Sequence, residues 1–216
     1  MEEDSFRAPS EITVPGDISS AAYFLVAGTI IAGSHLRLNN VGINPTRTGI
    51  LDVLRDMGAH ISVHNERESG GERVADLLVE AAPLHGVSFG AEIMPRLIDE
   101  IPVLAVAALF AEGDTIITGA GELRVKETDR LHAIATELQK LSPGSIEERE
   151  DGLVIHGKSE IRRAQVKSYD DHRMAMSLAV LGAAAEGVRI EEPDSVNISY
   201  PRFFSEMECL SKGGSL

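Results

Sequence analysis

The stretch Asp99-Glu100-Ile101-Pro102-Val103-Leu104-Ala105-Val106-Ala107-Ala108-Leu109-Phe110-Ala111-Glu112-Gly113 decides the fold of this chain. An acidic pair opens it, an unbroken apolar run follows, and Gly113 closes it. A helix that is apolar on every side is buried at the centre of a protein rather than laid on its surface. Residues 114–118 then alternate as a strand, and residues 127–141 show the spacing of an amphipathic helix. The stretch therefore predicts a central helix that leads into a sheet.

The same order of elements occurs three times along the sequence. Asp17 precedes an apolar helix over Ala21–Ile31, and Asp171 precedes another over Met174–Ala185. Repetition with a period of roughly 70 to 80 residues predicts a compact domain with pseudo-threefold symmetry rather than an open solenoid. The expected fold is α/β (α+β), with three buried helices surrounded by small sheets. The third unit lacks its final strands, so we expect strands from elsewhere, either residues 1–15 or a missing segment.

The remaining pattern predicts the outer elements of each unit. Helices are expected at 50–57 and 203–210, and strands at 35–38, 59–63, 76–80, 145–148, 153–156 and 188–191. A loop is expected at 40–48 and a polar hairpin-type connection at 65–73, and the strands 145–148 and 153–156 are expected to form a hairpin. No Pro/Ser-rich or charge-biased stretch divides residues 1–216, which predicts one domain. The acidic, polar residues 1–10 are expected to be disordered, and Glu11–Val14 is strand-like. Such a beginning fits a natural terminus or a cut made to isolate a domain.

Composition narrows the class of function. A net charge of −14 argues against a nucleic-acid partner, because phosphate backbones require a basic surface. A few local cations would still suffice for a small anionic substrate. The single cysteine, Cys209, excludes an internal disulfide and fits a reducing, cytoplasmic location. We expect no signal peptide and no membrane segment, since the longest apolar stretches run about a dozen residues.

The polar stretch Arg124-Val125-Lys126-Glu127-Thr128-Asp129-Arg130 is the first candidate for chemistry. It comes where the amphipathic helix begins, so we expect it on the first helical turn, where free N–H groups and the dipole favour an anion. Lys126 and Arg130, four residues apart, would lie on one side of that turn. Glu127 would face the protein as an acid/base group. The alternative is a solvated, salt-bridged helix start.

Two further polar groups open buried helices. Asp99 is either a functional carboxylate or simply an N-cap of its helix. His172 and Arg173 follow Asp171 at the matching position of the third unit and indicate an anion site. Arg47, in a comparable loop of the first unit, is interpreted as structural. The sequence contains no dinucleotide-binding glycine motif, P-loop, metal-binding His/Cys cluster or nucleophile elbow. The residues alone thus indicate an anion-handling site with carboxylate acid/base groups.

The chain resembles the C-terminal half of the EPSP synthase family. Arg124–Arg130 together with Asp170–Met176 is similar to the signature pair of that family, and Val14–Ala21 and Ile98–Pro102 are similar to two further family motifs. The resemblance runs from about residue 11 to residue 210. It implies a two-domain enzyme, each domain built from threefold βαβαββ repeats. It also implies transfer of the enolpyruvyl group of phosphoenolpyruvate to the 5-hydroxyl of shikimate 3-phosphate, with release of phosphate and without a metal or organic cofactor.

The resemblance also implies a role for each candidate residue. Asp99 would accept the proton of the substrate hydroxyl, and Glu127 would handle the proton at the enolpyruvyl methylene. Lys126 would contact shikimate 3-phosphate near the reacting oxygen. Arg130 and Arg173 would clamp phosphoenolpyruvate, with His172 beside them.

Two positions depart from many family members, which carry Asn in place of Glu122 and Lys in place of Ile198. The N-terminal domain of the family, which holds much of the shikimate-phosphate site, is not in this sequence, so the chain is expected to be inactive alone. Two alternatives remain: a domain of UDP-N-acetylglucosamine enolpyruvyl transferase, or a non-catalytic anion-binding module.

Overall fold

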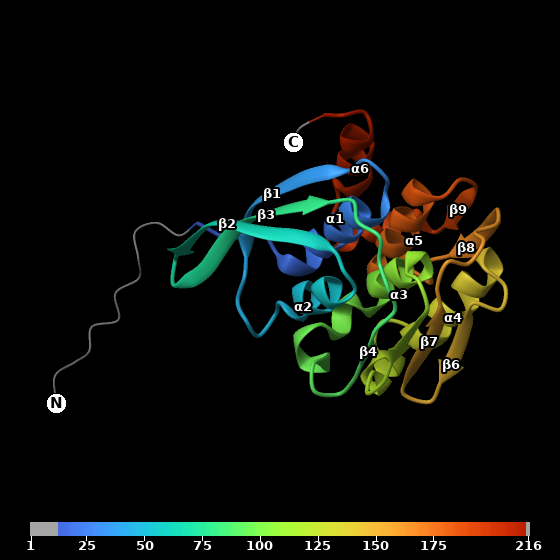
Figure 1. Ribbon diagram of the computed structural model, residues 1–216. Helices are drawn as coiled ribbons and strands as arrows, with labels where there is room; N and C mark the ends of the chain where they lie inside the picture. The colour runs from blue at the N-terminus through green and yellow to red at the C-terminus, as the bar shows by residue number, and fades with distance from the viewer. Residues whose placement is uncertain (1–12, 215–216) are drawn as a thin grey trace.

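Three apolar helices form the centre of the molecule. They are α1 (Ile18–Ile30), α3 (Ile101–Phe110) and α5 (His172–Ala184), and each packs against the other two. The structure is a computed structural model that describes residues 13–214. Figure 1 shows α3 and α5 side by side at the middle, with strands on the outside. Nearly every side chain of α3 is buried, as predicted for a helix without a polar face.

Each central helix is followed by a glycine and then a strand. Gly33, Gly113 and Gly187 have φ values of 79°, 87° and 90°, a left-handed conformation that a residue with a Cβ adopts only with strain. The strands that follow them are β1 (His35–Gly42), β5 (Asp114–Ile117) and β9 (Val188–Glu191). The glycines turn the chain sharply, and β1 and β9 pack against the helices that precede them, α1 and α5.

The strands form three separate sheets. The first has the order β1-β3-β2 and contains β2 (His60–Ser69) and β3 (Glu72–Glu80). The second has the order β4-β5-β7-β6 and contains β4 (Ser88–Phe89), β6 (Ile146–Arg149) and β7 (Gly152–His156). The third contains only β8 (Ala164–Lys167) beside β9, paired in parallel. Among the described residues, the predicted shortness of the third unit is therefore confirmed.

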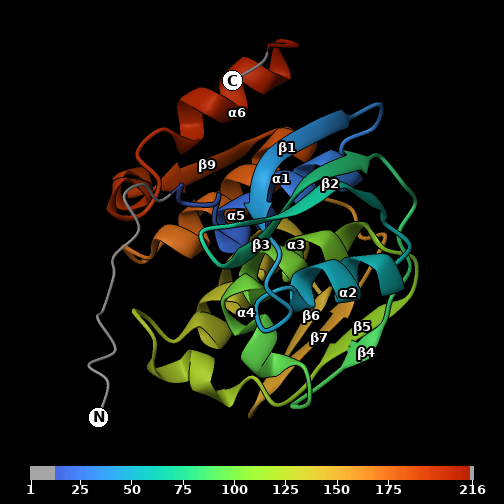
Figure 2. The ribbon, with the colours of Figure 1, turned by 90° about the vertical axis from the view of Figure 1, so that its left-hand side faces the viewer.

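Outer helices complete the units. They are α2 (Gly49–Asp56), α4 (Arg130–Leu141) and α6 (Phe203–Ser211), with 3₁₀ helices η1 (Met94–Arg96), η2 (Ile98–Glu100), η3 (Gly121–Val125) and η4 (Pro193–Ile198) between elements. Figure 2 shows α2 beneath the first sheet and α6 at the top of the view, above that sheet. Within residues 13–214, no helix combines the length and apolarity needed to cross a bilayer.

Several predicted boundaries were wrong. The polar connection expected at 65–73 is mostly strand, since β2 runs to Ser69 and β3 begins at Glu72. Its outer part pairs Arg67 with Val74 and Glu68 with Arg73, where β2 is exposed, so polar composition does not mark a loop there. β1 continues into the loop expected from residue 40, and the short strands β4 and β8 were not predicted.

The N-terminal predictions fall partly outside the described residues. Disorder at 1–10 and the first two residues of the strand at 11–14 cannot be compared with the structure, and Thr13 and Val14 are not in a strand. Gly16 forms a parallel bridge with Val41 of β1. The segment directly before α1 therefore lies beside the first sheet, in the place that β4 occupies beside β5 in the second.

Candidate active site

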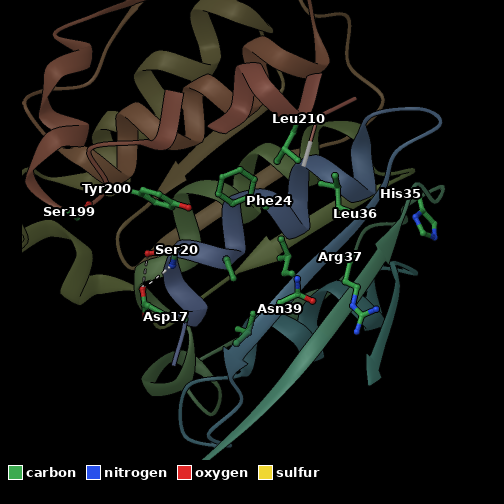
Figure 3. A pocket seen from close by; sticks show the side chains of 15 residues that line it. Asp17, Ser20, Phe24, His35, Leu36, Arg37, Asn39, Ser199, Tyr200 and Leu210 are labelled. Carbon is green, nitrogen blue, oxygen red and sulfur yellow. Dashed lines mark hydrogen bonds between the residues drawn. The ribbon is translucent and has the colours of Figure 1, made fainter. Parts of the chain in front are cut away.

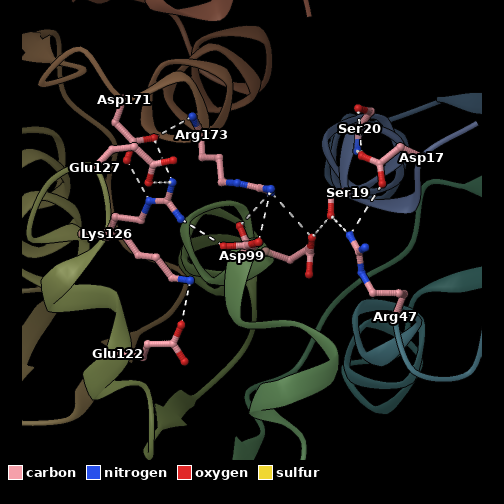
Figure 4. A network of polar contacts seen from close by, with 12 residues as sticks. Asp17, Ser19, Ser20, Arg47, Asp99, Glu122, Lys126, Glu127, Asp171 and Arg173 are labelled. Carbon is pink, nitrogen blue, oxygen red and sulfur yellow. Dashed lines mark hydrogen bonds and ion pairs between the residues drawn. The ribbon is translucent and has the colours of Figure 1, made fainter. Parts of the chain in front are cut away.

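Arg130 is the centre of a polar network at the start of the buried helices. Figure 4 shows Asp99, Glu127 and Asp171 converging in this network. The Arg130 side chain is only 1% exposed, yet three carboxylates surround it. Nε donates to Asp171 Oδ2 at 2.7 Å, Nη1 to Asp99 Oδ1 at 3.2 Å, and Nη2 to Glu127 Oε2 at 2.5 Å. The planar guanidinium presents donors in several fixed directions, which suits it to hold three acids that come from different segments.

Helix caps bring these groups together. Asp129 accepts the His132 N–H at 3.0 Å, which makes Arg130 the first residue of α4. Asp171 likewise caps α5 by accepting the N–H groups of Arg173 at 2.8 Å and Met174 at 3.3 Å. Because Asp171 is fully buried, its charge is balanced by the α5 N-terminus and by Arg130. The side chain that begins one helix thus binds the cap of another.

The predicted position of the charged stretch needs correction. Lys126 and Glu127 precede α4 instead of forming its first turn, because the chain enters the helix only at Asp129. Glu127 does not face the interior, and its side chain is half exposed. The 3.6-residue period did continue back to residue 127, but a capping aspartate overrides such a pattern by ending the run of helical dihedrals.

Asp99 is not an N-cap. It lies in η2, and its carboxylate makes no capping bond at α3 but lies between two guanidiniums. Oδ1 accepts from Arg130 at 3.2 Å and Oδ2 from Arg173 at 3.3 Å. Asp17, in contrast, caps α1 by accepting the Ser20 N–H at 2.9 Å. Asp99 therefore differs from Asp17 and Asp171, which cap helices. Its side chain is a third exposed and is bound by both Arg130 and Arg173.

Glu100, which the sequence reading did not single out, extends the network into the first unit. Its carboxylate is buried, accepts the Ser19 hydroxyl at 2.5 Å and lies 3.7 Å from Arg173 Nη1. Burial raises the pKa of this carboxyl above its usual range, since desolvation disfavours the charged form. Arg47, which was interpreted as structural, donates to Ser19 Oγ at 3.0 Å and is thereby connected to the site. The sequence contained one signal for Glu100: it and Ser19 are polar residues at the starts of two buried helices.

Lys126 and His172 lie at the edge of the network. Lys126 Nζ pairs with Glu122 Oε1 at 2.7 Å, and Figure 4 shows its amine on the side of Asp99 away from Arg47. His172 is the first residue of α5, and its side chain forms no hydrogen bond or ion pair with the described residues. Burial lowers the pKa of the His172 imidazole, which favours its neutral form.

Carboxylates outnumber cations in this network. The acids are Asp17, Asp99, Glu100, Glu122, Glu127 and Asp171, and the cations are Arg47, Lys126, Arg130 and Arg173. Each guanidinium is already bound by protein carboxylates, so an anion would compete with them. No group of three or more His, Cys, Asp or Glu side chains in residues 13–214 is arranged to hold a metal ion.

Comparison with known proteins decides the family. A profile of EPSP synthase (3-phosphoshikimate 1-carboxyvinyltransferase) matches residues 3–207. The chain belongs to the EPSP synthase family. Among curated members of this family, the 3-phosphoshikimate 1-carboxyvinyltransferase of Gloeobacter violaceus is 57% identical over 202 residues, which are 93% of this chain and 46% of that protein. That of Bacillus cereus (strain G9842) is 51% identical over 94% of this chain and 47% of its own length. The chain thus spans about half the length of these relatives.

Solved structures confirm the predicted fold class. An EPSP synthase from Acinetobacter baumannii superposes with a TM-score of 0.87 at 41% identity, over 93% of this chain and 46% of that one. The enolpyruvyl transferase NikO from Streptomyces tendae superposes with a TM-score of 0.72 at 22% identity, over 91% of this chain and 43% of NikO, which shows a shared fold only. The family predicted from four sequence motifs is therefore confirmed, and the roles of the individual EPSP synthase motif residues stay predictions.

Proposed function

We propose that this chain is one domain of a two-domain EPSP synthase. The enzyme would transfer the enolpyruvyl group of phosphoenolpyruvate to the 5-hydroxyl of shikimate 3-phosphate and release phosphate. The observation that carries the proposal is the network around Arg130, in which Asp99, Glu127 and Arg173 meet from three separate segments. Family membership favours this reaction over the UDP-N-acetylglucosamine alternative.

Asp99 and Glu127 are the proposed proton-transfer groups. Both are carboxylates that touch Arg130 and remain partly exposed, at 33% and 50% of the side chain, so a substrate can reach them. Asp99 would accept the proton of the attacking hydroxyl, and Glu127 would exchange a proton with the methylene carbon. Proton transfer by a positioned side chain requires hydrogen-bonding reach to the reacting atom, which partly open positions allow.

Arg130, Arg173 and Lys126 would bind the anionic substrates, with His172 beside them. A guanidinium can bind phosphate or carboxylate through two parallel hydrogen bonds, and fixed cations stabilise charge that develops in the transition state. Their present partners are carboxylates of this chain, and the acids are in excess. We therefore infer that the other half of the enzyme supplies further cations and that the isolated domain is inactive.

Complementation tests the function. Combining this chain with the separately produced half of the Gloeobacter violaceus relative that it does not match should restore phosphate release from the two substrates. Each half alone should release none above background. A pair shown to be folded and associated, yet inactive at saturating substrates, would contradict the proposal. In that case, titration with phosphoenolpyruvate that shifts amides away from Lys126, Arg130 and Arg173, or that shifts none, would favour the non-catalytic module instead.

The third sheet supports the two-domain organisation. In the second unit, β5 has β4 on one edge and β7, antiparallel, on the other. The matching strand β9 has only β8, and no described strand pairs with its second edge. A groove of about 850 Å³ lies beside β9 and is lined by Ala183 of α5, Ile190 of β9 and Met207 of α6. A neighbouring groove between α1, β1 and α6 is lined by Phe24, Leu36 and Leu210, with Tyr200 before α6 (Figure 3). We infer that strands from the other half complete this sheet.

Hydrogen exchange tests that inference residue by residue. The carbonyls of Gly187 and Glu191 accept bonds from the segment containing β8, so by strand alternation the N–H groups of Val188 and Ile190 face the open edge. Both amides should exchange rapidly in this chain alone and become at least about 100-fold protected in the assembled pair. The amides of Arg189 and Glu191, which face β8, serve as internal controls because they should be protected in both states. Unchanged exchange at Val188 and Ile190 in an associated pair would contradict the inference.

A further inference from the structure

Arg173 is held by two carboxylates of different character. Asp99 Oδ2 accepts from Nη2 at 3.3 Å, and the Asp99 backbone carbonyl accepts from Nη1 at 3.4 Å. Glu100 Oε1 lies 3.7 Å from Nη1. The Asp99 side chain is a third exposed, whereas that of Glu100 is 4% exposed. A substrate can therefore reach Asp99 directly but has little access to Glu100.

Glu100 is itself fixed by a directional chain of hydrogen bonds. Arg47 Nη2 donates to Ser19 Oγ at 3.0 Å, so this hydroxyl uses a lone pair on Arg47 and directs its single hydrogen to Glu100 Oε1 at 2.5 Å. Ser19 belongs to the first turn of α1, and Asp17, which caps that helix, lies 3.6 Å from Arg47. Figure 4 shows this chain running from the first unit to the Arg173 guanidinium. Oε1 of the buried Glu100 thus lies between the Ser19 hydroxyl and the Arg173 guanidinium.

We propose that Glu100 is a positioning residue that, fixed by Ser19 and Arg47, keeps the Arg173 guanidinium oriented toward phosphoenolpyruvate. The inference rests on the proposed function, in which Asp99 accepts a proton from the substrate hydroxyl. Once Asp99 is protonated or turns toward substrate, its hold on Arg173 weakens. Glu100 takes no part in that proton transfer and keeps its charge, so it remains the counter-ion of Arg173 through the reaction.

Electrostatics makes this arrangement dependent on pH. Desolvation by burial raises the pKa of Glu100, against the lowering effects of Ser19, Arg173 and Arg47, while Asp99 raises it further. Tyr23 of α1 also faces this group, and burial raises the pKa of its phenol, so it stays neutral at physiological pH. Glu100 therefore takes up a proton at higher pH than an ordinary glutamate, and its hold on Arg173 weakens as the pH falls through the raised pKa.

Kinetics of the assembled enzyme tests the proposal. In Glu100→Gln and Ser19→Ala we expect the KM for phosphoenolpyruvate to rise about tenfold, with smaller changes in kcat and in the KM for shikimate 3-phosphate. The ratio of variant to wild-type KM for Glu100→Gln should be largest near neutral pH and approach one as the pH falls. Because both KM values are measured at the same pH, their ratio is not affected by the titration of phosphoenolpyruvate itself. Glu112→Gln is the matched control, because this exposed glutamate after α3 forms an ion pair with Lys158 at 2.7 Å and, within residues 13–214, with no other side chain.

A second measurement does not depend on turnover. In this chain alone, the Nη signals of an ion-paired Arg173 should show slow rotation of the guanidinium by nitrogen NMR, with faster rotation in Glu100→Gln and Ser19→Ala and no change in Glu112→Gln. Tighter phosphoenolpyruvate binding in Glu100→Gln would overturn the proposal, since Glu100 would then act as a competing anion. Unchanged Arg173 signals would also overturn it. An inactive pair that still shows the altered signals would count against the proposed function and leave the positioning role supported.

Discussion

Replacing Arg130 with methionine is expected to destabilise the folded chain by about 3–5 kcal/mol, because it leaves the buried Asp171 carboxylate without its cation. The Arg130 side chain is 1% exposed and that of Asp171 is fully buried, so water cannot take the place of the guanidinium. A loss of this size is a large part of the roughly 5–15 kcal/mol by which a domain is stable. Urea unfolding followed by circular dichroism measures the loss.

Two further variants identify the cause of that destabilisation. Arg149→Met removes a guanidinium from an exposed pair with Glu147 and should leave the unfolding midpoint nearly unchanged. The double variant Arg130→Met/Asp171→Asn should be more stable than Arg130→Met alone, because asparagine can still cap α5 and carries no charge. If Arg130→Met unfolds within about 1 kcal/mol of wild type, the buried pair does not have the role assigned to it.

Replacing Glu127 with glutamine is expected to lower kcat of the assembled enzyme by about 100- to 10,000-fold, the usual contribution of a general acid or base. The substitution keeps an oxygen that can accept from Arg130 Nη2 and removes only the ability to exchange a proton. Because the side chain is half exposed, stability should hardly change. Initial rates of phosphate release at saturating substrates, with the other half in excess, give kcat free of association effects.

Glu147→Gln is the matched control for this experiment. Glu147 is also a half-exposed glutamate in an ion pair with an arginine, but it lies on β6, outside the network. Its substitution should leave kcat unchanged. A Glu127→Gln enzyme that keeps more than about a tenth of wild-type kcat would remove Glu127 from proton transfer, since no proton-transfer group contributes so little.

The pattern of apolar residues and glycines in the sequence made much of the fold predictable. The unbroken apolar runs in α1, α3 and α5 require burial on every side, and the glycines that end them are read directly from the sequence. The hairpin β2–β3 was predicted, but its outer strand residues were assigned to the connection, because β2 is charged and exposed on both faces there. A strand without a buried face carries no alternation that a pattern can detect.

The candidate site was predictable only as a set of residues. Arg130, Asp99 and Arg173 are recognisable because charged groups beside buried helices are uncommon, and the family motifs contain them. Their pairing was not predictable, since 31 residues separate Asp99 from Arg130 and 74 separate it from Arg173. The same limit hid Glu100, whose partner Ser19 lies 81 residues away.

The sequence by itself determined the three buried helices, their glycine ends and the family, because these depend on local composition and on motifs that are contiguous. Only the tertiary structure decided which aspartates cap a helix and which bind an arginine. Asp17, Asp99 and Asp171 each precede a buried helix. Asp17 and Asp171 are N-cap residues and accept backbone N–H groups, while Asp99 lies one residue before the N-cap position of α3 and between Arg130 and Arg173. A carboxylate at a helix start can bind either partner, and the choice depends on which cations the packed helices bring within reach.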